Sequence, residues 1–492
     1  MPNAPANPQR RVEKLTAILD VAKAMTAARD LESLLELVLR ETSKVVDADR
    51  ASIFLADRAR GELWIRAAQG AEKEIRIPIG TGIAGFVAES GSIVNIPDCY
   101  ADPRFNRQVD LATGYRTQNL LCAPMRSAAG EIVGVIQALN KHDGPFTAED
   151  EELVLVLGGQ AAAALENAML HEEIQRLFEG FVKASVVAIE SRDPSTAGHS
   201  GRVASLTVNL AQALERNGRG LYAGTTFSAT EIHEIRYASL LHDFGKVGVR
   251  EPVLVKADKL FPFELEVLQA RFEVIGRTLE AESYKKQLEL LRAGKSTDEE
   301  AQALAARLVE LDGMLGFVKE CNRPTVLARG GFEKLDEIRR RSFQDRAGVA
   351  RGYLTDGELS RLSIARGSLT EDERKEIESH VVHTFRFLQQ IPWTRALRRV
   401  PEIAAAHHEK LDGTGYPNAL PEPSIPVQSR MMAISDIYDA LTASDRPYKK
   451  AVPHDKALDI LGMEAKAKKI DTELLGIFIE AEIPKKALAK SS

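Results

Sequence analysis

The chain contains little cysteine and no excess of positive charge. Its 492 residues include three cysteines, Cys99, Cys122 and Cys321, which are too few and too scattered for a disulfide framework. The formal net charge of -6 excludes the global basic field that would bind duplex nucleic acid or an acidic membrane surface. Both observations favour a protein of the reducing cytoplasm.

Long apolar runs are also missing from the printed sequence. The opening residues, MPNAPANPQRRVEKL, carry basic side chains but no apolar stretch of the kind found in a secretory signal. We find no apolar run of the roughly 18–20 residues that a membrane span requires. With 44% apolar and 28% charged residues, the chain is expected to be a cytoplasmic globular protein of two to four domains, without membrane contact.

Two textures follow each other along the chain. Residues 1–14 are expected to form a disordered tail, and apolar residues then recur at helical spacing to about Val46. Six short, roughly alternating runs come next, beginning at Ala51, Leu63, Ile75, Ser92, Leu120 and Ile132. They predict an antiparallel sheet of five or six strands with helices on one face.

From Phe146 onward the pattern is helical almost to the end of the chain. Thr147-Ala-Glu-Asp150 is similar to a capping box, and helix-favouring sequence continues to about Arg192. One continuous helix fits this stretch, and so do two helices broken near Gly180. The fold expected is multidomain: an α+β domain joined by a long helix to an all-α bundle.

The first domain resembles GAF domains. Asn140, Lys141, Phe146, Asp150 and Glu151 match the Asn-Lys, Phe and Asp-Glu motif of GAF domains that bind cyclic nucleotides, and two upstream segments, 80–85 and 96–105, resemble GAF pocket loops. The resemblance implies a sensor domain over residues 15–170 for an unknown small ligand, with Asn140, Lys141, Phe146 and Asp150 as pocket candidates. The alternative is an ion pair between Lys141 and Asp150 that ties the last strand to the next helix above Phe146.

Charged and imidazole groups interrupt three apolar helices in the second half. His242-Asp243 ends one helix, His407-His408-Glu409 ends another, and Asp436 lies within a third. Burying such groups is costly unless something offsets the lost hydration, and bound metal is the usual answer. Nitrogen and oxygen donors without thiolate indicate iron, manganese or zinc.

The segment HHEKLDGTGYP, residues 407–417, resembles the signature of the bacterial HD-GYP phosphodiesterases. Segments 193–200, 240–248 and 436–449 resemble other parts of the family in the same order. The resemblance implies an HD-type helical bundle over residues 191–485, after a connecting helix at 171–190. It implies two or three bound metal ions and cleavage of cyclic di-GMP to linear pGpG or to GMP. Because Ser195 and Thr196 stand where a third ion would need a carboxylate, we expect two ions, iron or manganese.

One family histidine is displaced. At family spacing its position is taken by Arg271, which cannot ligate a metal. A similar helix occurs further on and contains His380, so residues 265–365 are interpreted as a helical insertion and His380 as the ligand. His383, one turn along the same face, is the alternative. The insertion itself is expected to be a partner or dimer surface.

The resemblance also implies the roles of the remaining residues. The expected metal ligands are His199, His242, Asp243, His380, His407, His408 and Asp436, with Asp243 bridging two ions about 3.5–4 Å apart. Asp243 and Lys246 would be catalytic, with Lys246 offsetting phosphate charge. Arg446 and Lys449 would hold a second phosphate. Gly415, Tyr416 and Pro417 would shape the substrate edge and could contact a diguanylate cyclase partner.

Three other functions remain open at this stage. The substrate could be another cyclic dinucleotide, such as cyclic GMP-AMP. The bundle could belong to a different dinuclear HD enzyme, an oxygenase or a nucleotide phosphohydrolase, although the Gly-Tyr-Pro segment argues against this. It could also be a non-catalytic, nucleotide-responsive receptor. A homodimer is also expected.

Overall fold

The computed structural model describes residues 24–25, 31–68, 76–193, 197–324, 331–443 and 451–485. The chain divides into two compact units, Met1–Glu179 and Gly180–Ser492. The expected tail at 1–14, the Ser195-Thr196 pair and the phosphate-binding candidates Arg446 and Lys449 lie outside the described residues.

The first unit contains a six-stranded sheet in the order β3-β2-β1-β6-β5-β4, and every neighbouring pair is antiparallel. The strands are β1 (Ala48–Asp57), β2 (Glu62–Ala68), β3 (Arg76–Pro78), β4 (Val94–Ile96), β5 (Leu120–Arg126) and β6 (Ile132–Lys141). The helices are α2 (Leu31–Val45), α3 (Gly82–Ser90), the short turn η1 (Cys99–Ala101), α4 (Arg107–Thr113) and the start of α5 (Ala148–Arg192).

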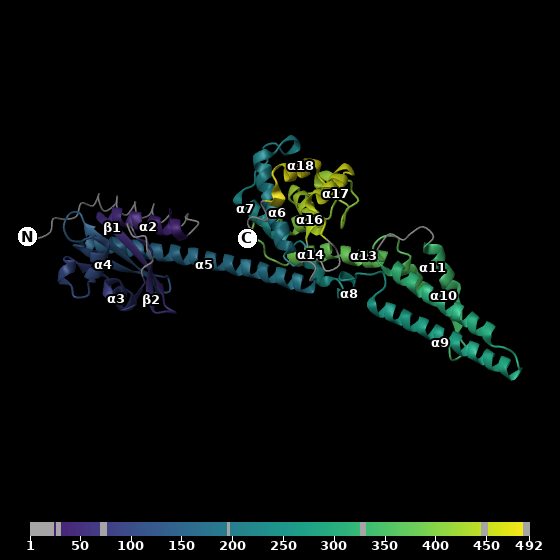
Figure 1. Cartoon of the computed structure of the whole chain (residues 1–492). Helices are drawn as coiled ribbons and strands as arrows, with labels where there is room; N and C mark the ends of the chain where they lie inside the picture. The colour runs from purple at the N-terminus through teal and green to yellow at the C-terminus, as the bar shows by residue number, and fades with distance from the viewer. Residues whose placement is uncertain are drawn as a thin grey trace, which may run out of the picture. The chain divides into compact units, whose positions relative to one another are not determined.

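Helices cover both faces of this sheet, so the expectation of helices on one face is wrong. Successive side chains of a strand point to opposite faces. Ile53 and Leu55 of β1 therefore join a core with α2 and α5, whereas Phe54 between them joins a second core with α3 (Figure 1). The sheet is apolar on both sides, which blurs the alternation that a one-sided sheet would show.

Helix α5 runs without interruption through Gly180. Of the two alternatives for this stretch, one continuous helix is therefore correct, and a break near Gly180 is not. Thr147 and Asp150 form the reciprocal pair of a capping box: the Thr147 amide donates to Asp150 and the Asp150 amide donates to Thr147. By length and composition α5 could cross a membrane, which corrects the expectation that no such stretch exists. Its apolar residues Val154 and Leu157 are buried in the core of the first unit, so this is weak evidence for a membrane span.

The second unit is a bundle of helices. Helices α6, α7, α16, α17 and α18 share one apolar core, and α14 and α15 pack beside it. The elements outside the insertion are α6 (His199–Asn217), η3 (Gly220–Tyr222), α7 (Ala229–Leu241), η4 (Phe244–Gly248), α8 (Glu251–Leu254), α13 (Glu371–Glu378), α14 (His380–Leu388), α15 (Val400–Ala405), η5 (Glu422–Ser424), α16 (Val427–Thr442), α17 (His454–Lys466) and α18 (Thr472–Glu480).

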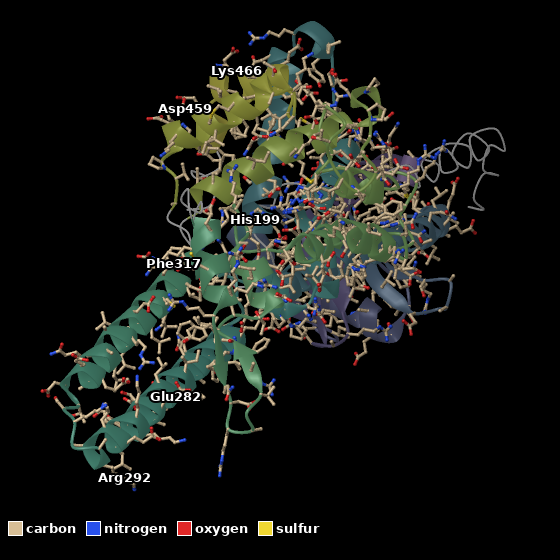
Figure 2. The ribbon with its side chains drawn as sticks, turned by 90° about the vertical axis from the view of Figure 1, so that its right-hand side faces the viewer. His199, Glu282, Arg292, Phe317, Asp459 and Lys466 are labelled. Atoms are coloured by element: carbon tan, nitrogen blue, oxygen red, sulfur yellow. The ribbon has the colours of Figure 1, made fainter. Side chains whose placement is uncertain are left out.

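A separate subdomain interrupts the bundle between α8 and α13. It consists of α9 (Pro262–Arg292), α10 (Asp298–Asn322), α11 (Gly331–Arg340), the ribbon β7 (Ser342–Gln344) and β8 (Ala350–Gly352), and α12 (Asp356–Leu362). These elements bury their own core, which contains Phe272 and Val318, and the α9–α10 hairpin projects from the bundle (Figure 2). An ion pair of 2.7 Å between the buried Lys256 and Glu373 joins the two ends of the insertion.

Candidate metal centre

Helix ends deliver most of the candidate ligands to one place in the second unit. His199 is the first residue of α6, His242 is the C-cap of α7, and His380 is the first residue of α14. His407 and His408 follow α15, and Asp436 lies inside α16. Residues up to 237 positions apart in sequence therefore meet in one buried cluster (His199 is labelled in Figure 2).

The cluster has two halves that share Asp243. His199, His242 and Asp436 form one group and His380, His407 and His408 another, each with donor atoms within 4.8 Å of one another. Asp243 lies between them, with Oδ2 3.5 Å from His242 Nε2 and Oδ1 3.3 Å from His380 Nε2. One carboxylate thus directs one oxygen to each half.

Backbone carbonyls fix the tautomer of three of these histidines. The Nδ1 atoms of His242, His380 and His407 lie 2.8, 2.6 and 2.5 Å from the carbonyl oxygens of Ser239, Ile377 and Ala404. A carbonyl can only accept, so Nδ1 carries the proton and Nε2 keeps its lone pair. Within the described residues, these three Nε2 atoms are buried without a hydrogen-bond partner. Such orphaned nitrogens fit a bound cation.

The electrostatics favour neutral imidazoles at His242, His407 and His408 and an ionised carboxylate at Asp243. Burial lowers the pKa of His242, and burial together with neighbouring histidines lowers the pKa of His408 to about 4. Burial opposes ionisation of Asp243, but Lys246 and the surrounding imidazoles hold its pKa well below the usual value. His199 differs: burial alone would lower its pKa, but Asp436 and Asp439 raise it to about 9.

A glycine lets η4 approach α14 closely enough to bring Asp243 beside His380. A Cβ on Gly245 would lie 1.8 Å from the His380 carbonyl oxygen, so no larger residue fits without movement. The buried Thr384 hydroxyl joins the same elements: it accepts from the Gly245 amide (2.8 Å) and donates to the His242 carbonyl (3.0 Å).

The two alternative histidines of α14 lie in different surroundings. His380 faces the cluster, whereas the His383 ring lies against the backbone of Gly248, where a Cβ would come within 2.9 Å of it. Arg271 is bound elsewhere, donating to Glu358 at 2.6 Å. Of His380, His383 and Arg271, it is His380 that the structure places with His407 and His408.

Sequence reasoning missed three residues that support the cluster. The buried Asp439 accepts from His199 Nδ1 at 2.7 Å and from Arg202 Nε at 2.7 Å, which turns His199 Nε2 toward Asp436. Glu409 accepts from the amides of Asn418 and Leu420 and so holds the 410–420 loop. The signal for Asp439 was its position three residues, nearly one helical turn, after Asp436.

The remaining site candidates lie at the edge of the cluster where they are described. Lys246 Nζ is 2.8 Å from Asp243 Oδ2 and 3.4 Å from Asp193 Oδ2. Tyr416 packs on His408 with ring centroids 4.8 Å apart. Gly415 lies so close to Glu409 and Lys410 that a Cβ there would be 2.3 Å from the Lys410 amide nitrogen, and Pro417 follows on the same loop. Arg446 and Lys449 are outside the described residues.

The pocket of the first unit is lined by other residues than those the motif suggested. Its cavity of about 180 Å³ includes Phe54, Asp110, Thr117 and Gln137. The motif residues are bonded among themselves: Lys141 pairs with Asp150 above the buried Phe146, and Asn140 bonds the 116–118 backbone. Asn140, Lys141, Phe146 and Asp150 are not among the residues that line this cavity, and the ion pair between Lys141 and Asp150 is the one that the alternative interpretation expected. They join β6 to α5 instead.

Comparison with known families identifies a GAF domain over residues 30–165 and an HD domain over residues 350–474. The HD segment contains His380, His407, His408 and Asp436, whereas the other three cluster residues precede the insertion. The multidomain fold expected from the sequence, a GAF domain followed by a largely helical HD-type domain, is thus confirmed.

Similarity to curated proteins covers about a third of the chain. A probable 3',5'-cyclic phosphodiesterase of Caenorhabditis elegans is 36% identical over 32% of this chain and 24% of its own length. A dual 3',5'-cyclic-AMP and -GMP phosphodiesterase of Drosophila melanogaster is 34% identical over 34% of this chain and 13% of its own length. The chain therefore matches less than a quarter of these relatives.

Among solved structures, the GAF domain of a Coxiella burnetii phosphoenolpyruvate-protein phosphotransferase is 25% identical, covers 32% of this chain and 96% of that chain, and has a TM-score of 0.30. A GAF domain followed by an HD-type domain, homologous in part to cyclic nucleotide phosphodiesterases and carrying donors for divalent metal, is what the chain contains.

Proposed function

We propose that the chain is a metal-dependent phosphodiesterase whose HD-type domain hydrolyses cyclic di-GMP to linear pGpG or GMP, under control of the GAF domain. The observation that carries this proposal is the buried cluster of His199, His242, Asp243, His380, His407, His408 and Asp436, divided into two halves by Asp243. Three buried imidazole nitrogens without partners among the described residues support metal binding there.

Each half of the cluster offers the donor atoms that a divalent first-row transition metal prefers. Nitrogen and carboxylate oxygen without sulfur suit iron or manganese, and we propose two such ions. When bound, a pair of ions polarises the phosphodiester and makes water a nucleophile at neutral pH. Burial keeps the imidazoles of His242 and His408 neutral, Lys246 helps to hold Asp243 ionised between the halves, and Asp439 orients His199.

Residues at the rim of the cluster would bind the substrate. Lys246 is held between Asp243 and Asp193, where its ammonium can offset phosphate charge near the ions. Arg446 and Lys449 are proposed to bind the second phosphate, and the loop of Gly415, Tyr416 and Pro417 to form the substrate edge. The partial similarity to 3',5'-cyclic phosphodiesterases supports a cyclic phosphodiester as substrate, and the HD-GYP resemblance of residues 407–417 favours a cyclic dinucleotide.

Regulation would start in the cavity of the GAF domain. Its polar side chains, Asp110, Thr117 and Gln137, suit a small ligand with hydrogen-bonding groups. The proposed domains are a sensor at 15–170, a connecting helix at 171–190 and an enzyme domain at 191–485 with an insertion at 265–365. The protein is further proposed to be cytoplasmic, to form a homodimer and to bind a diguanylate cyclase.

Asp243→Ala tests the dinuclear centre. The purified protein, kept anaerobic with Fe(II) or supplied with Mn(II), should hydrolyse cyclic di-GMP, and Asp243→Ala should abolish turnover because the carboxylate shared by both halves is lost. Asp459→Ala, an exposed carboxylate on α17 (Figure 2), is the matched control and should be fully active. Full activity of Asp243→Ala would exclude the dinuclear mechanism.

Parallel assays separate the alternative functions. Faster cleavage of cyclic GMP-AMP, or of a 3',5'-cyclic mononucleotide, would show that cyclic di-GMP is not the preferred substrate. It would leave the proposed metal centre unchanged. Tight binding of metal and nucleotide without turnover would indicate a receptor and contradict the proposal of an enzyme.

A further inference from the structure

Helix α9 of the insertion has two apolar sides. One side packs on α10 and buries Leu268, Phe272 and Ile275. The other is exposed along the 31-residue helix, which is about 46 Å long at 1.5 Å per residue. A soluble helix normally needs only one apolar stripe to reach its own core, so the second stripe requires a separate explanation.

The exposed stripe follows a strict alternation of four and three residues. Its members, here called the α9 row, are all exposed: Phe263, Val267, Ala270, Val274, Arg277, Ala281, Tyr284, Leu288 and Leu291. Phe263, Tyr284 and Leu291 are 63, 59 and 62% exposed. This spacing averages 3.5 residues and continues for four heptads, which is the period of a left-handed coiled coil and not that of a single straight helix.

Charges flanking the row indicate the orientation of a partner helix. Glu273 and Glu280 lie on one flank, and Lys285 and Arg292 on the other. In a parallel pair of identical helices, each residue of the first flank faces the residue five positions further on in the partner, so Glu280 meets Lys285 of the partner subunit. An antiparallel pair would bring each flank against itself and place like charges together. Charge complementarity therefore favours a parallel pair.

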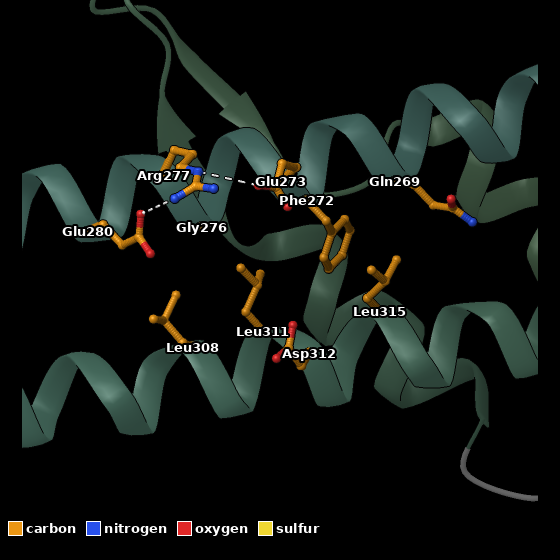
Figure 3. Close-up of a pocket in the computed structure, with 10 residues that line it drawn as sticks. All are labelled: Gln269, Phe272, Glu273, Gly276, Arg277, Glu280, Leu308, Leu311, Asp312 and Leu315. Carbon is orange, nitrogen blue, oxygen red and sulfur yellow. Dashed lines mark hydrogen bonds and ion pairs between the residues drawn. The ribbon is translucent and has the colours of Figure 1, made fainter.

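The acidic flank borders a groove between α9 and α10. Its cavity of about 220 Å³ has an apolar floor that includes Phe272 and Leu311, with Glu273 and Glu280 at the rim. Figure 3 shows Arg277 between these two glutamates, 3.3 and 3.0 Å away. Arg277 is the charged member of the row, and one such residue in a coiled-coil seam costs stability while fixing register.

We infer that the α9 row pairs with the same row of a second copy of this chain, as a parallel and in-register two-stranded coiled coil. Its occupant is thus another α9, whose Lys285 lies against Glu280 of the acidic rim. This surface supplies the homodimer of the proposed function, and its test does not depend on catalysis.

Cysteine cross-linking of the full-length protein tests the pairing. Equivalent residues of the row face each other in a parallel in-register coil, so Ala281→Cys should form a covalent dimer when diamide oxidises the two thiols. Ala305→Cys, an exposed alanine on α10, is the matched control. Held at high effective concentration, the Ala281→Cys pair should react on the order of 10²-fold faster than the control. The native cysteines are all buried.

Charge placed in the row should remove this cross-link. Adding Leu288→Glu to Ala281→Cys should return its rate to that of the control, whereas Val309→Glu, at an exposed apolar position on α10, should leave it unchanged. Equal rates for Ala281→Cys and Ala305→Cys would overturn the proposal. Cross-links found only between Val267→Cys and Leu288→Cys chains would overturn the parallel orientation. Turnover of cyclic di-GMP is a separate readout, so failure of either proposal can be recognised by itself.

Discussion

At the scale of single residues, the position of one ring nitrogen decides what a histidine can do. His242, His380 and His407 each donate a hydrogen bond from Nδ1–H to a carbonyl oxygen three residues earlier. The geometry is local to each helix end, and it leaves three Nε2 lone pairs directed into one space. Carbonyl groups at the helix ends thus fix both the orientation and the tautomer of these imidazoles.

The two histidines of α14 give the clearest test at this scale. His380→Ala should lose bound metal and activity, because it removes a nitrogen beside Asp243. His383→Ala should keep the metal content of the wild type, because that ring packs on Gly248. Metal content by elemental analysis, with circular dichroism to verify folding, provides the measurement. Equal metal loss in both variants would contradict the assignment of His380.

Asp150 makes the stability of the GAF domain depend on acid. Burial opposes its ionisation, but bonds from Lys141 and Thr147 outweigh burial and hold the pKa of Asp150 below its usual value. A lowered carboxyl pKa gives stability that is present above the unfolded-state pKa of about 3.9 and is lost as pH falls through the folded-state pKa.

Asp150→Asn should therefore destabilise the GAF domain at pH 7 by about 1.5–3 kcal/mol, as expected for lost hydrogen bonds to a charged group. It should also flatten the decline of unfolding free energy below about pH 4. Fluorescence of Trp64 in a Trp393→Phe background reports this domain alone, since the chain has two tryptophans, one in each unit. An unchanged pH slope in Asp150→Asn would show that other carboxylates control acid unfolding.

At the scale of elements, the contact of η4 with α14 assembles the two halves of the centre. Gly245→Ala would push a methyl group into the His380 carbonyl. We therefore expect the free energy of unfolding to fall by about 1–3 kcal/mol and the metal content to decrease. Gly462→Ala, inside α17 with open space around it, is the matched control and should stabilise its helix by up to about 1 kcal/mol. Thermal unfolding of both variants gives the comparison, and a neutral Gly245→Ala would mean that the two elements can move apart freely.

At the scale of the whole molecule, α5 belongs to both units and is one continuous helix. Removing residues 1–170 should change the rate of hydrolysis while metal content is retained, because every candidate ligand lies beyond Glu190. If a cyclic nucleotide bound to the GAF domain changes substrate affinity, a substrate analogue must change the affinity of that nucleotide by the same factor. Identical rates for truncated and full-length protein, with and without candidate nucleotides, would exclude regulation by this domain.

The sequence by itself determined the kinds of element and the kinds of chemistry. The capping box at Thr147, the alternating strands and the donor-rich helix ends are local patterns, and local patterns persist in the fold. Tertiary structure decided what depends on distant contacts. Helices cover both faces of the sheet because its strands carry apolar side chains on both faces, and each face must be buried. One face packs against α2 and α5, and the other packs against α3. His380 and His383 are equivalent by helical spacing, and only the approach of Gly245 and Gly248 separates them. Asp439 and His199 are 240 residues apart, so no periodicity could have paired them.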